Sequence, residues 1–211
     1  MNELLKIYDK LLQHYGTQAW WQSETKDEVI IGAILTQNTN WKNVVKAIDN
    51  LKEYSLCSLA AIEDVETEKL ALLIKPSGYY NVKATRLQHV SRALNDVDLD
   101  EMPLKEAREY LLNIKGVGNE TADSILLYAY RKPAFVIDAY TIRLIDRLYP
   151  ENKMKKYDEY KAYFEQQLPQ EVLLFDEFHA LIVRHGKIYC RKRALCDGCP
   201  LIDICSSFQR G

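Results

Sequence analysis

The chain has 211 residues, of which 47% are hydrophobic and 27% are charged, and its formal net charge is −2. This composition is typical of a globular protein with a buried core, and the near-neutral charge argues against a protein that coats DNA through bulk positive charge. There is no apolar run of about 18 residues and no signal-peptide pattern at the start, so the sequence predicts a cytoplasmic protein with no membrane span.

Apolar residues recur at helical spacing along most of the chain. The pattern predicts helices over residues 4–15, 27–35, 44–51, 70–74, 83–94, 104–112, 121–130, 140–148, 157–167 and 171–184. Glycine and proline turns at Gly16, at residues 76–78 and 116–118, and at Pro133 separate several of these helices. The β-like run at residues 135–137 is too short to build a sheet. The sequence therefore predicts an all-α fold.

Four cysteines lie close together near the end of the chain. The spacing is C-x5-C-x2-C-x5-C, formed by Cys190, Cys196, Cys199 and Cys205. Structural disulfides are rare in the cytoplasm, so this spacing favours one metal centre held by four thiolates. Both tetrahedral zinc and an iron–sulfur cluster fit such a donor set.

A glycine turn and an aspartate give two further signals. Gly116, Val117 and Gly118 form a tight turn between two predicted helices, where exposed N–H groups can bind a DNA phosphate. The turn alone is also what a plain helix–helix connection needs. Asp138 follows an apolar run and opens the next helix, where aspartate is a common N-cap. A carboxylate facing a cleft could instead stabilise the oxocarbenium-like sugar that forms when a base leaves DNA.

These motifs, in this order, resemble the endonuclease III branch of the helix-hairpin-helix (HhH-GPD) DNA glycosylases. The resemblance rests on residues 35–39, 78–84, 111–123, 136–138 and 185–187 and on the four cysteines. It implies two helical domains with a DNA-binding cleft between them. One is a six-helix barrel over residues 22–132 that ends in the helix-hairpin-helix. The other is a discontinuous iron–sulfur domain built from residues 1–21 and 133–211.

The resemblance also assigns roles to particular residues. It implies that Asp138 is the catalytic carboxylate and that the four cysteines hold a [4Fe–4S] cluster, although the first cysteine gap is one residue shorter than usual. Gln37 and Tyr79 would lie near the DNA stack and fill or wedge the gap left by a flipped nucleotide. The hairpin Gly116, Val117 and Gly118 would contact DNA. The main-chain carbonyls of the hairpin residues Leu112, Ile114 and Val117 would hold a monovalent cation beside the phosphate.

One departure from the family pattern bears on the chemistry. Members that cleave the strand carry a lysine in G-V-G-x-K, and Glu120 occupies that position here. An amine can form a Schiff base with the sugar and a carboxylate cannot, so we expect a monofunctional enzyme that uses water. Lys115 lies across the turn and is a poor substitute. Glu120 and Lys187 are candidates for the catalytic cleft; Glu120 is equally explained as a first-turn helix acid.

The sequence resembles most the bacterial 3-methyladenine glycosylases within this branch. Alkylated purines are electron-poor and stack well on aromatic faces. The candidates for the base pocket are Trp20, Trp21 and Trp41, although tryptophan is equally typical of a core. The expected partner is double-stranded DNA with a damaged base. We expect a cytoplasmic protein of bacterial type that associates with the nucleoid through DNA. We also expect a monomer.

Three other functions stay open. A bifunctional glycosylase and lyase for oxidised pyrimidines is disfavoured by Glu120. An adenine-mismatch glycosylase would carry a further recognition domain, for which we expect no room after the cysteines. A non-catalytic DNA-binding iron–sulfur module is disfavoured by Asp138 in its motif.

Overall fold

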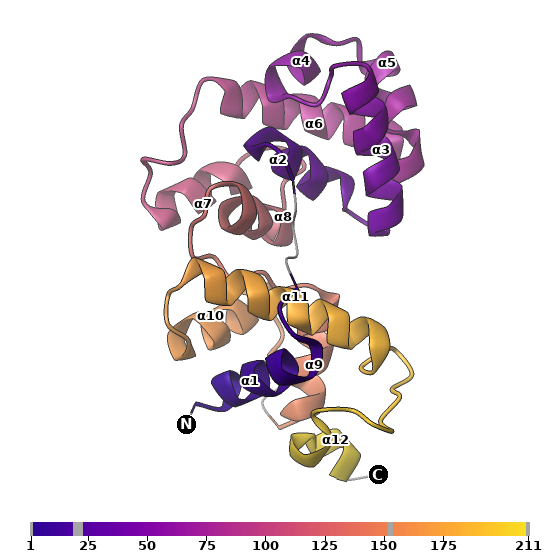
Figure 1. Ribbon diagram of the computed structural model, residues 1–211. Helices are drawn as coiled ribbons and strands as arrows, with labels where there is room; N and C mark the ends of the chain where they lie inside the picture. Colours follow the sequence, from indigo (N-terminus) through magenta and orange to yellow (C-terminus); the bar gives the residue numbers. More distant parts are fainter. Residues whose placement is uncertain (1, 19–22, 152–153, 210–211) are drawn as a thin grey trace. The chain divides into compact units, whose positions relative to one another are not determined.

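The computed structural model describes residues 2–18, 23–151 and 154–209, and in these ranges it contains helices and loops but no strand (Figure 1). The all-α prediction is therefore confirmed. The chain divides into two compact units, residues 21–132 and residues 1–20 with 133–211. Among the described residues, no helix is long and apolar enough to cross a membrane.

The unit of residues 21–132 surrounds one buried helix. Seven α-helices lie in its described part, where the family resemblance implies six. They are α2 (Lys26–Leu35), α3 (Trp41–Glu53), α4 (Leu59–Asp64), α5 (Thr67–Leu73), α6 (Tyr80–Asn95), α7 (Leu104–Leu112) and α8 (Asn119–Ser124), with a 3-10 turn η1 (Lys75–Ser77) and a π-helix η2 (Ile125–Ala129). Every residue from Val29 to Leu35 is buried, so α2 forms the centre of this unit. A helix that is apolar all round belongs inside a core.

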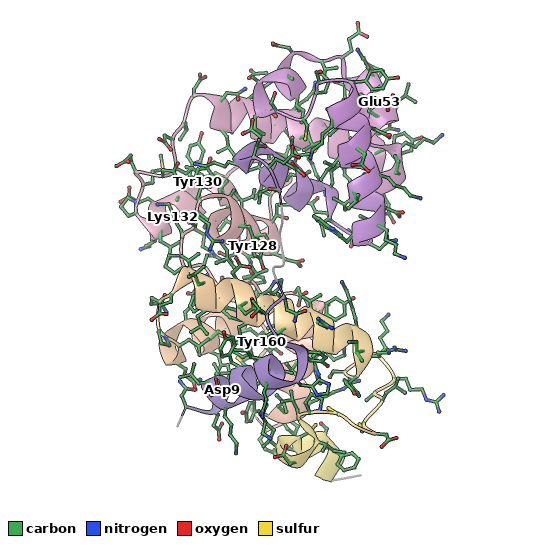
Figure 2. All side chains as sticks on the ribbon, viewed as in Figure 1. Asp9, Glu53, Tyr128, Tyr130, Lys132 and Tyr160 are labelled. Atoms are coloured by element: carbon green, nitrogen blue, oxygen red, sulfur yellow. The ribbon has the colours of Figure 1, made fainter. Side chains whose placement is uncertain are left out.

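The second unit is built from both ends of the chain. It contains α1 (Glu3–Tyr15), α9 (Ala139–Leu148), α10 (Tyr157–Gln167), α11 (Val172–Ile188), the 3-10 turn η3 (Ile202–Ile204) and α12 (Ser206–Gln209). Helix α11 packs against α1 and α9. Tyr160 of α10, labelled in Figure 2, donates to Asp146 of α9 over 2.6 Å.

The structure departs from the predicted helices at two places in the unit of residues 21–132. Helix α4 was not predicted, because six residues are too few to show a helical period; the Ser58 side chain caps it by accepting from Ala61 N–H. The helix predicted over residues 121–130 is instead α8 followed by the π-helix. Residues 135–137 build no sheet, as the sequence predicts, and all three are buried, so their apolar character reflects the core.

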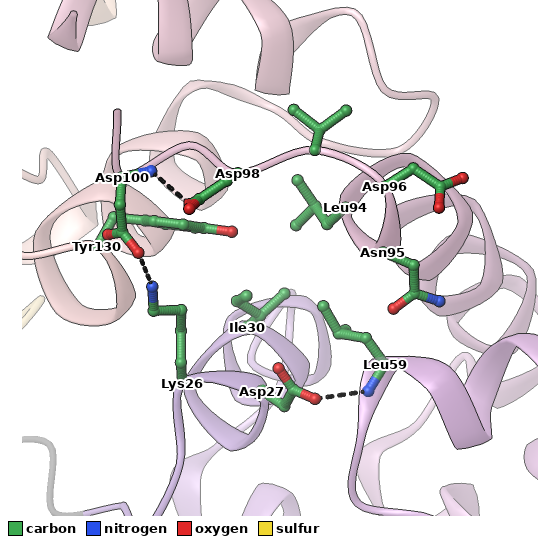
Figure 3. Close-up of a pocket in the computed structure, with 11 residues that line it drawn as sticks. Lys26, Asp27, Ile30, Leu59, Leu94, Asn95, Asp96, Asp98, Asp100 and Tyr130 are labelled. Atoms are coloured by element: carbon green, nitrogen blue, oxygen red, sulfur yellow. Dashed lines mark hydrogen bonds and ion pairs between the residues drawn. The ribbon is translucent and has the colours of Figure 1, made fainter. Parts of the chain in front are cut away.

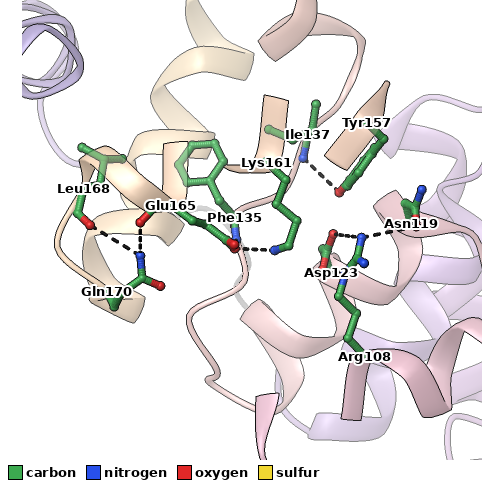
Figure 4. A network of polar contacts seen from close by, with 10 residues as sticks. All are labelled: Arg108, Asn119, Asp123, Phe135, Ile137, Tyr157, Lys161, Glu165, Leu168 and Gln170. Carbon is green, nitrogen blue, oxygen red and sulfur yellow. Dashed lines mark hydrogen bonds and ion pairs between the residues drawn. The ribbon is translucent and has the colours of Figure 1, made fainter. Parts of the chain in front are cut away.

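Four phenylalanines form the core of the second unit. Phe135 is fully buried, stacks on Phe164 at 4.1 Å between ring centroids, and meets Phe175 and Phe178 edge-on at 5.2 and 5.9 Å. Figure 4 shows that the Phe135 N–H donates to Glu165 Oε1 over 2.9 Å. The extended segment before Asp138 is thus fixed by both its side chain and its main chain.

We expect Phe135→Ala to lower the free energy of unfolding by about 3–5 kcal/mol, because it leaves a cavity among three rings. Leu173→Ala is the control, since Leu173 is 75% exposed and its loss leaves no cavity. Urea unfolding of both variants measures the difference. Equal stability of the two variants would contradict this description of the core.

Candidate functional site

Asp138 is the N-cap of α9, and one of its two carboxylate oxygens makes the whole cap. Oδ1 accepts from the N–H groups of Tyr140 and Thr141, at 2.9 and 2.8 Å, and from the Thr141 hydroxyl at 3.0 Å. The other oxygen, Oδ2, lies 3.6 Å from His179 Nε2 on α11. The Asp138 side chain is only 12% exposed. The cap therefore fixes the carboxylate and leaves Oδ2 facing a histidine.

This environment keeps Asp138 ionised. Burial alone would raise the pKa of the Asp138 carboxyl, but His179, 3.6 Å from Oδ2, and the hydrogen bonds from Thr141 hold that pKa below its usual value. His179 was not singled out from the sequence, because it lies far from Asp138 along the chain. Only the packing of α11 against α9 brings the two together.

Helix α9 also holds the segment that carries the cysteines. Arg143 Nε donates to the Cys190 carbonyl over 2.7 Å. Arg147 Nη1 lies 3.1 Å from Cys190 Sγ and 2.7 Å from the Arg191 carbonyl, and its Nη2 donates to Lys192 O over 2.9 Å. Two arginines of α9 thus hold the start of the cysteine segment through its main-chain carbonyls and the Cys190 sulfur. Sequence patterns do not single out these two arginines, because they precede the cysteines by some forty residues.

The four cysteines carry free thiols that lie near one another. Cys190 is buried and the other three are half-buried. Burial raises the pKa of the Cys199 thiol, and the charges of Cys190, Cys196 and Cys205 add to the rise. In the described part of the chain, no three His, Cys, Asp or Glu side chains converge as they would on a single metal ion. Four thiols in one short segment are nevertheless the donor chemistry that an iron–sulfur cluster takes.

His185 packs beside the cysteines as a neutral ring. It is 1% exposed, and burial lowers its pKa to about 4. Its Nδ1 lies 3.1 Å from the Tyr15 hydroxyl and its Nε2 lies 3.8 Å from Cys199 Sγ. These contacts give His185 a packing role beside the cysteine segment.

The glycine hairpin in the other unit has the tight geometry that the sequence predicts. Gly116 has φ +100°, a conformation that other residues rarely adopt. Arg108 of α7 binds both carboxylate oxygens of the fully buried Asp123 on α8, at 2.9 and 3.2 Å, and so braces the two helices of the hairpin (Figure 4). The Val117 N–H donates to the Ile114 carbonyl over 3.0 Å. That N–H is therefore used inside the hairpin.

Gln37 lies against this hairpin, whereas Tyr79 stands out from the protein. Gln37 Nε2 donates to the Gly116 carbonyl over 3.1 Å and to the Thr121 hydroxyl over 3.0 Å. Tyr79 has φ +47° at the start of α6 and is 72% exposed. The two residues were predicted to meet DNA, and the structure places Gln37, but not Tyr79, in hydrogen-bond contact with the hairpin.

The remaining candidates are exposed or outside the described residues. Glu120 and Lys187 are exposed, on α8 and α11 respectively. Trp41 begins α3 and is 39% exposed, which is unusual for a core tryptophan. Trp20 and Trp21 lie outside the described residues.

A pocket of about 510 Å³ lies elsewhere in the unit of residues 21–132 (Figure 3). Its charged lining is Lys26 and four aspartates: Asp27, Asp96, Asp98 and Asp100. Burial raises the pKa of Tyr130 in its wall to about 12. Lys26 is paired with Asp100, so the lining is negative overall and repels a phosphate backbone.

Comparisons with known proteins agree on one family. The chain matches the HhH-GPD superfamily of base excision DNA repair proteins over residues 31–170. It is 50% identical over 211 residues to a provisionally assigned DNA repair glycosylase of Methanocaldococcus jannaschii, across 97% of this chain and 96% of that protein. It is 31% identical over 182 residues to the endonuclease III of Sulfolobus acidocaldarius, across 85% of this chain and 81% of that one.

A solved structure shares the fold as well as the sequence pattern. The crystal structure of H. pylori 3-methyladenine DNA glycosylase bound to 1,N6-ethenoadenine matches with a TM-score of 0.73 and 33% identity. The match covers 88% of this chain and 96% of that chain.

We expect His179→Asn to raise the pKa of Asp138, because the variant loses the imidazole charge opposite Oδ2. A carboxylate with a depressed folded-state pKa stabilises the fold above its unfolded pKa, and this contribution is lost as pH falls through the folded pKa. In the variant, the contribution of the Asp138 carboxylate to the free energy of unfolding is smaller and is lost at a higher pH. Urea unfolding between about pH 3 and pH 7 measures this, with His89→Asn as the control. The same loss of stability at low pH in the variant as in the unmodified protein would contradict the interaction between His179 and Asp138.

Proposed function

The chain belongs to the HhH-GPD superfamily of base excision DNA repair proteins, and we propose that it hydrolytically releases an alkylated purine, such as 3-methyladenine, from DNA without cutting the strand. The similarity to known proteins makes it a DNA repair glycosylase, whichever base it releases. The observation that carries the proposal is Asp138: a mostly buried, ionised carboxylate with one oxygen not used by the helix cap.

The position of Asp138 suits base excision chemistry. As the base leaves, positive charge develops on the deoxyribose, and a fixed carboxylate stabilises that charge. A carboxylate held by a cap and a histidine needs little reorganisation when the charge appears. In this proposal Asp138 stabilises the sugar cation and helps to position the attacking water.

Similarity and chemistry together favour an alkylated purine as the substrate. The H. pylori relative is a 3-methyladenine DNA glycosylase with a bound ethenoadenine. A cationic alkylated base is a good leaving group and stacks on aromatic faces, so it needs little acid catalysis. The partly exposed Trp41 is the pocket candidate that the structure describes. Trp20 and Trp21, the other two pocket candidates, lie outside the described residues.

The alternative is a glycosylase with lyase activity, of the endonuclease III type. The similarity to the S. acidocaldarius endonuclease III supports this alternative. That chemistry needs an amine at the sugar. Glu120 occupies the position of the family's lysine, and the nearby Lys115 is exposed on the other side of the turn. Lys187 is proposed as a contact to DNA or to an acid in the cleft.

The hairpin is proposed as the grip on the DNA backbone. Glycines at positions 116 and 118 let a phosphate approach the main chain closely. A monovalent cation held by hairpin carbonyls is part of this proposal. Gln37 beside the hairpin and the exposed Tyr79 would fill or wedge the gap left by the flipped nucleotide. The protein would act as a monomer on double-stranded DNA.

A [4Fe–4S] cluster is proposed as the cofactor. The four thiols would bind it, with Arg147 beside Cys190 and His185 beside Cys199. When bound, the cluster supplies a covalent staple for a segment that has little core of its own. Arg143 and Arg147 would fix that segment on α9.

We expect Asp138→Asn to slow base release from 3-methyladenine DNA by about 100-fold or more, because the charge that stabilises the sugar cation is lost. Asparagine caps helices about as well as aspartate, so stability should change by less than about 1 kcal/mol. Single-turnover release of free base by excess protein measures the effect. Asp146→Asn on the same helix is the matched control. A variant as active as its control would remove Asp138 from the mechanism.

We expect the purified protein to show broad visible absorbance and about four irons per chain. Replacing a ligand, as in Cys199→Ser, should remove the absorbance and lower the melting temperature. Cys57→Ser should leave both unchanged, because Cys57 lies outside the cysteine segment. Stoichiometric zinc with no visible absorbance would replace the cluster with a zinc site.

A further inference from the structure

Both ends of the Gln37 amide are hydrogen-bonded. Its nitrogen donates to the Gly116 carbonyl over 3.1 Å and to the Thr121 hydroxyl over 3.0 Å. Its oxygen accepts from Arg86 Nη1. Turning the amide by 180° would set oxygen against a carbonyl and nitrogen against a guanidinium, and both contacts are unfavourable. The network therefore allows one orientation of Gln37.

Arg86 also packs directly on the hairpin. A Cβ added to Gly116 would lie 2.5 Å from Arg86 Cγ and 2.9 Å from its Cδ. The aliphatic stem of Arg86 thus occupies the space in front of Gly116, while the guanidinium reaches the Gln37 oxygen. Arg86 is half-buried on α6 and is the side chain that contacts both Gln37 and the turn at Gly116.

A second cation of α6 fixes the main chain that carries Gln37. Lys83 lies one turn before Arg86 and is 1% exposed. Its Nζ donates to the carbonyl of Leu35, the last residue of α2, over 2.8 Å, and to the Ser77 carbonyl over 2.7 Å. The end of α2 is therefore held at its main chain by Lys83 and at the Gln37 side chain by Arg86.

We propose that Arg86 is a positioning residue that sets Gln37 against the hairpin, so that binding of a phosphate by the hairpin and filling of the base gap by Gln37 act together. The inference rests on the proposed roles of Gln37 and the hairpin. A glutamine that is already oriented loses little freedom when it enters the gap. Arg86 acts through Gln37, so its contribution disappears when Gln37 is absent.

The test uses a DNA duplex with a tetrahydrofuran abasic analogue, which leaves a base gap and needs no catalysis. Arg86→Met keeps the stem on Gly116 and removes the guanidinium. Arg92→Met is the matched control, because Arg92 is exposed on the same helix and its loss removes the same charge. We expect Arg86→Met to speed dissociation from the analogue about tenfold more than the control, as for a lost hydrogen bond to a charged group. Arg86→Lys should restore part of the lifetime.

A double-mutant cycle shows whether Arg86 acts by positioning Gln37 or only by supporting the hairpin. In a Gln37→Ala background, Arg86→Met should have no more effect than Arg92→Met. An undiminished effect in that background, or equal effects of both methionine variants in the native background, would overturn the proposal. Melting temperatures show whether each variant folds. If Arg86→Met does not fold, Arg86→Lys replaces it in the comparison with and without Gln37. Unmodified protein that does not prefer the analogue over undamaged DNA would instead overturn the proposed function.

Discussion

The hydrogen bonds from α9 to one oxygen of Asp138 are the interaction on which the second unit depends. They fix the carboxylate, define where α9 begins, and leave Oδ2 facing His179. The same helix then carries Arg143 and Arg147, which hold the main chain and a sulfur of the cysteine segment. The proposed catalytic carboxylate and the proposed cluster site are thus placed by one helix. A disturbance of the cysteine segment is expected to reach Asp138 through α9.

Helix α6 has the corresponding role in the unit of residues 21–132. Lys83 and Arg86 reach from one face of α6 to the end of α2 and to the hairpin. Burying a lysine is costly, and burial lowers its pKa to about 8, yet two carbonyls accept its hydrogen bonds. The wedge residue and the phosphate grip in the proposed function are therefore held by the same helix.

The sequence predicts those parts of the structure that depend on local spacing. The apolar period identifies most helices, and the motifs identify the cysteines, the glycine hairpin and Asp138. Helix α4 and the π-helix escape prediction, because one is too short and the other keeps the apolar pattern of an α-helix. His179, Arg86 and Arg147 escape it because their partners are distant in sequence.

The most direct test of the central claim is a reaction of excess protein with a duplex that carries alkylated purines. Free base is identified by mass spectrometry, and strand breaks are read with and without alkali. The account predicts release of 3-methyladenine, with breaks only after alkali and no protein–DNA adduct on borohydride treatment, because water rather than an amine attacks the sugar. Strand breaks without alkali and a trapped adduct would contradict it and identify a lyase, above all if they appear on a second duplex that carries oxidised pyrimidines.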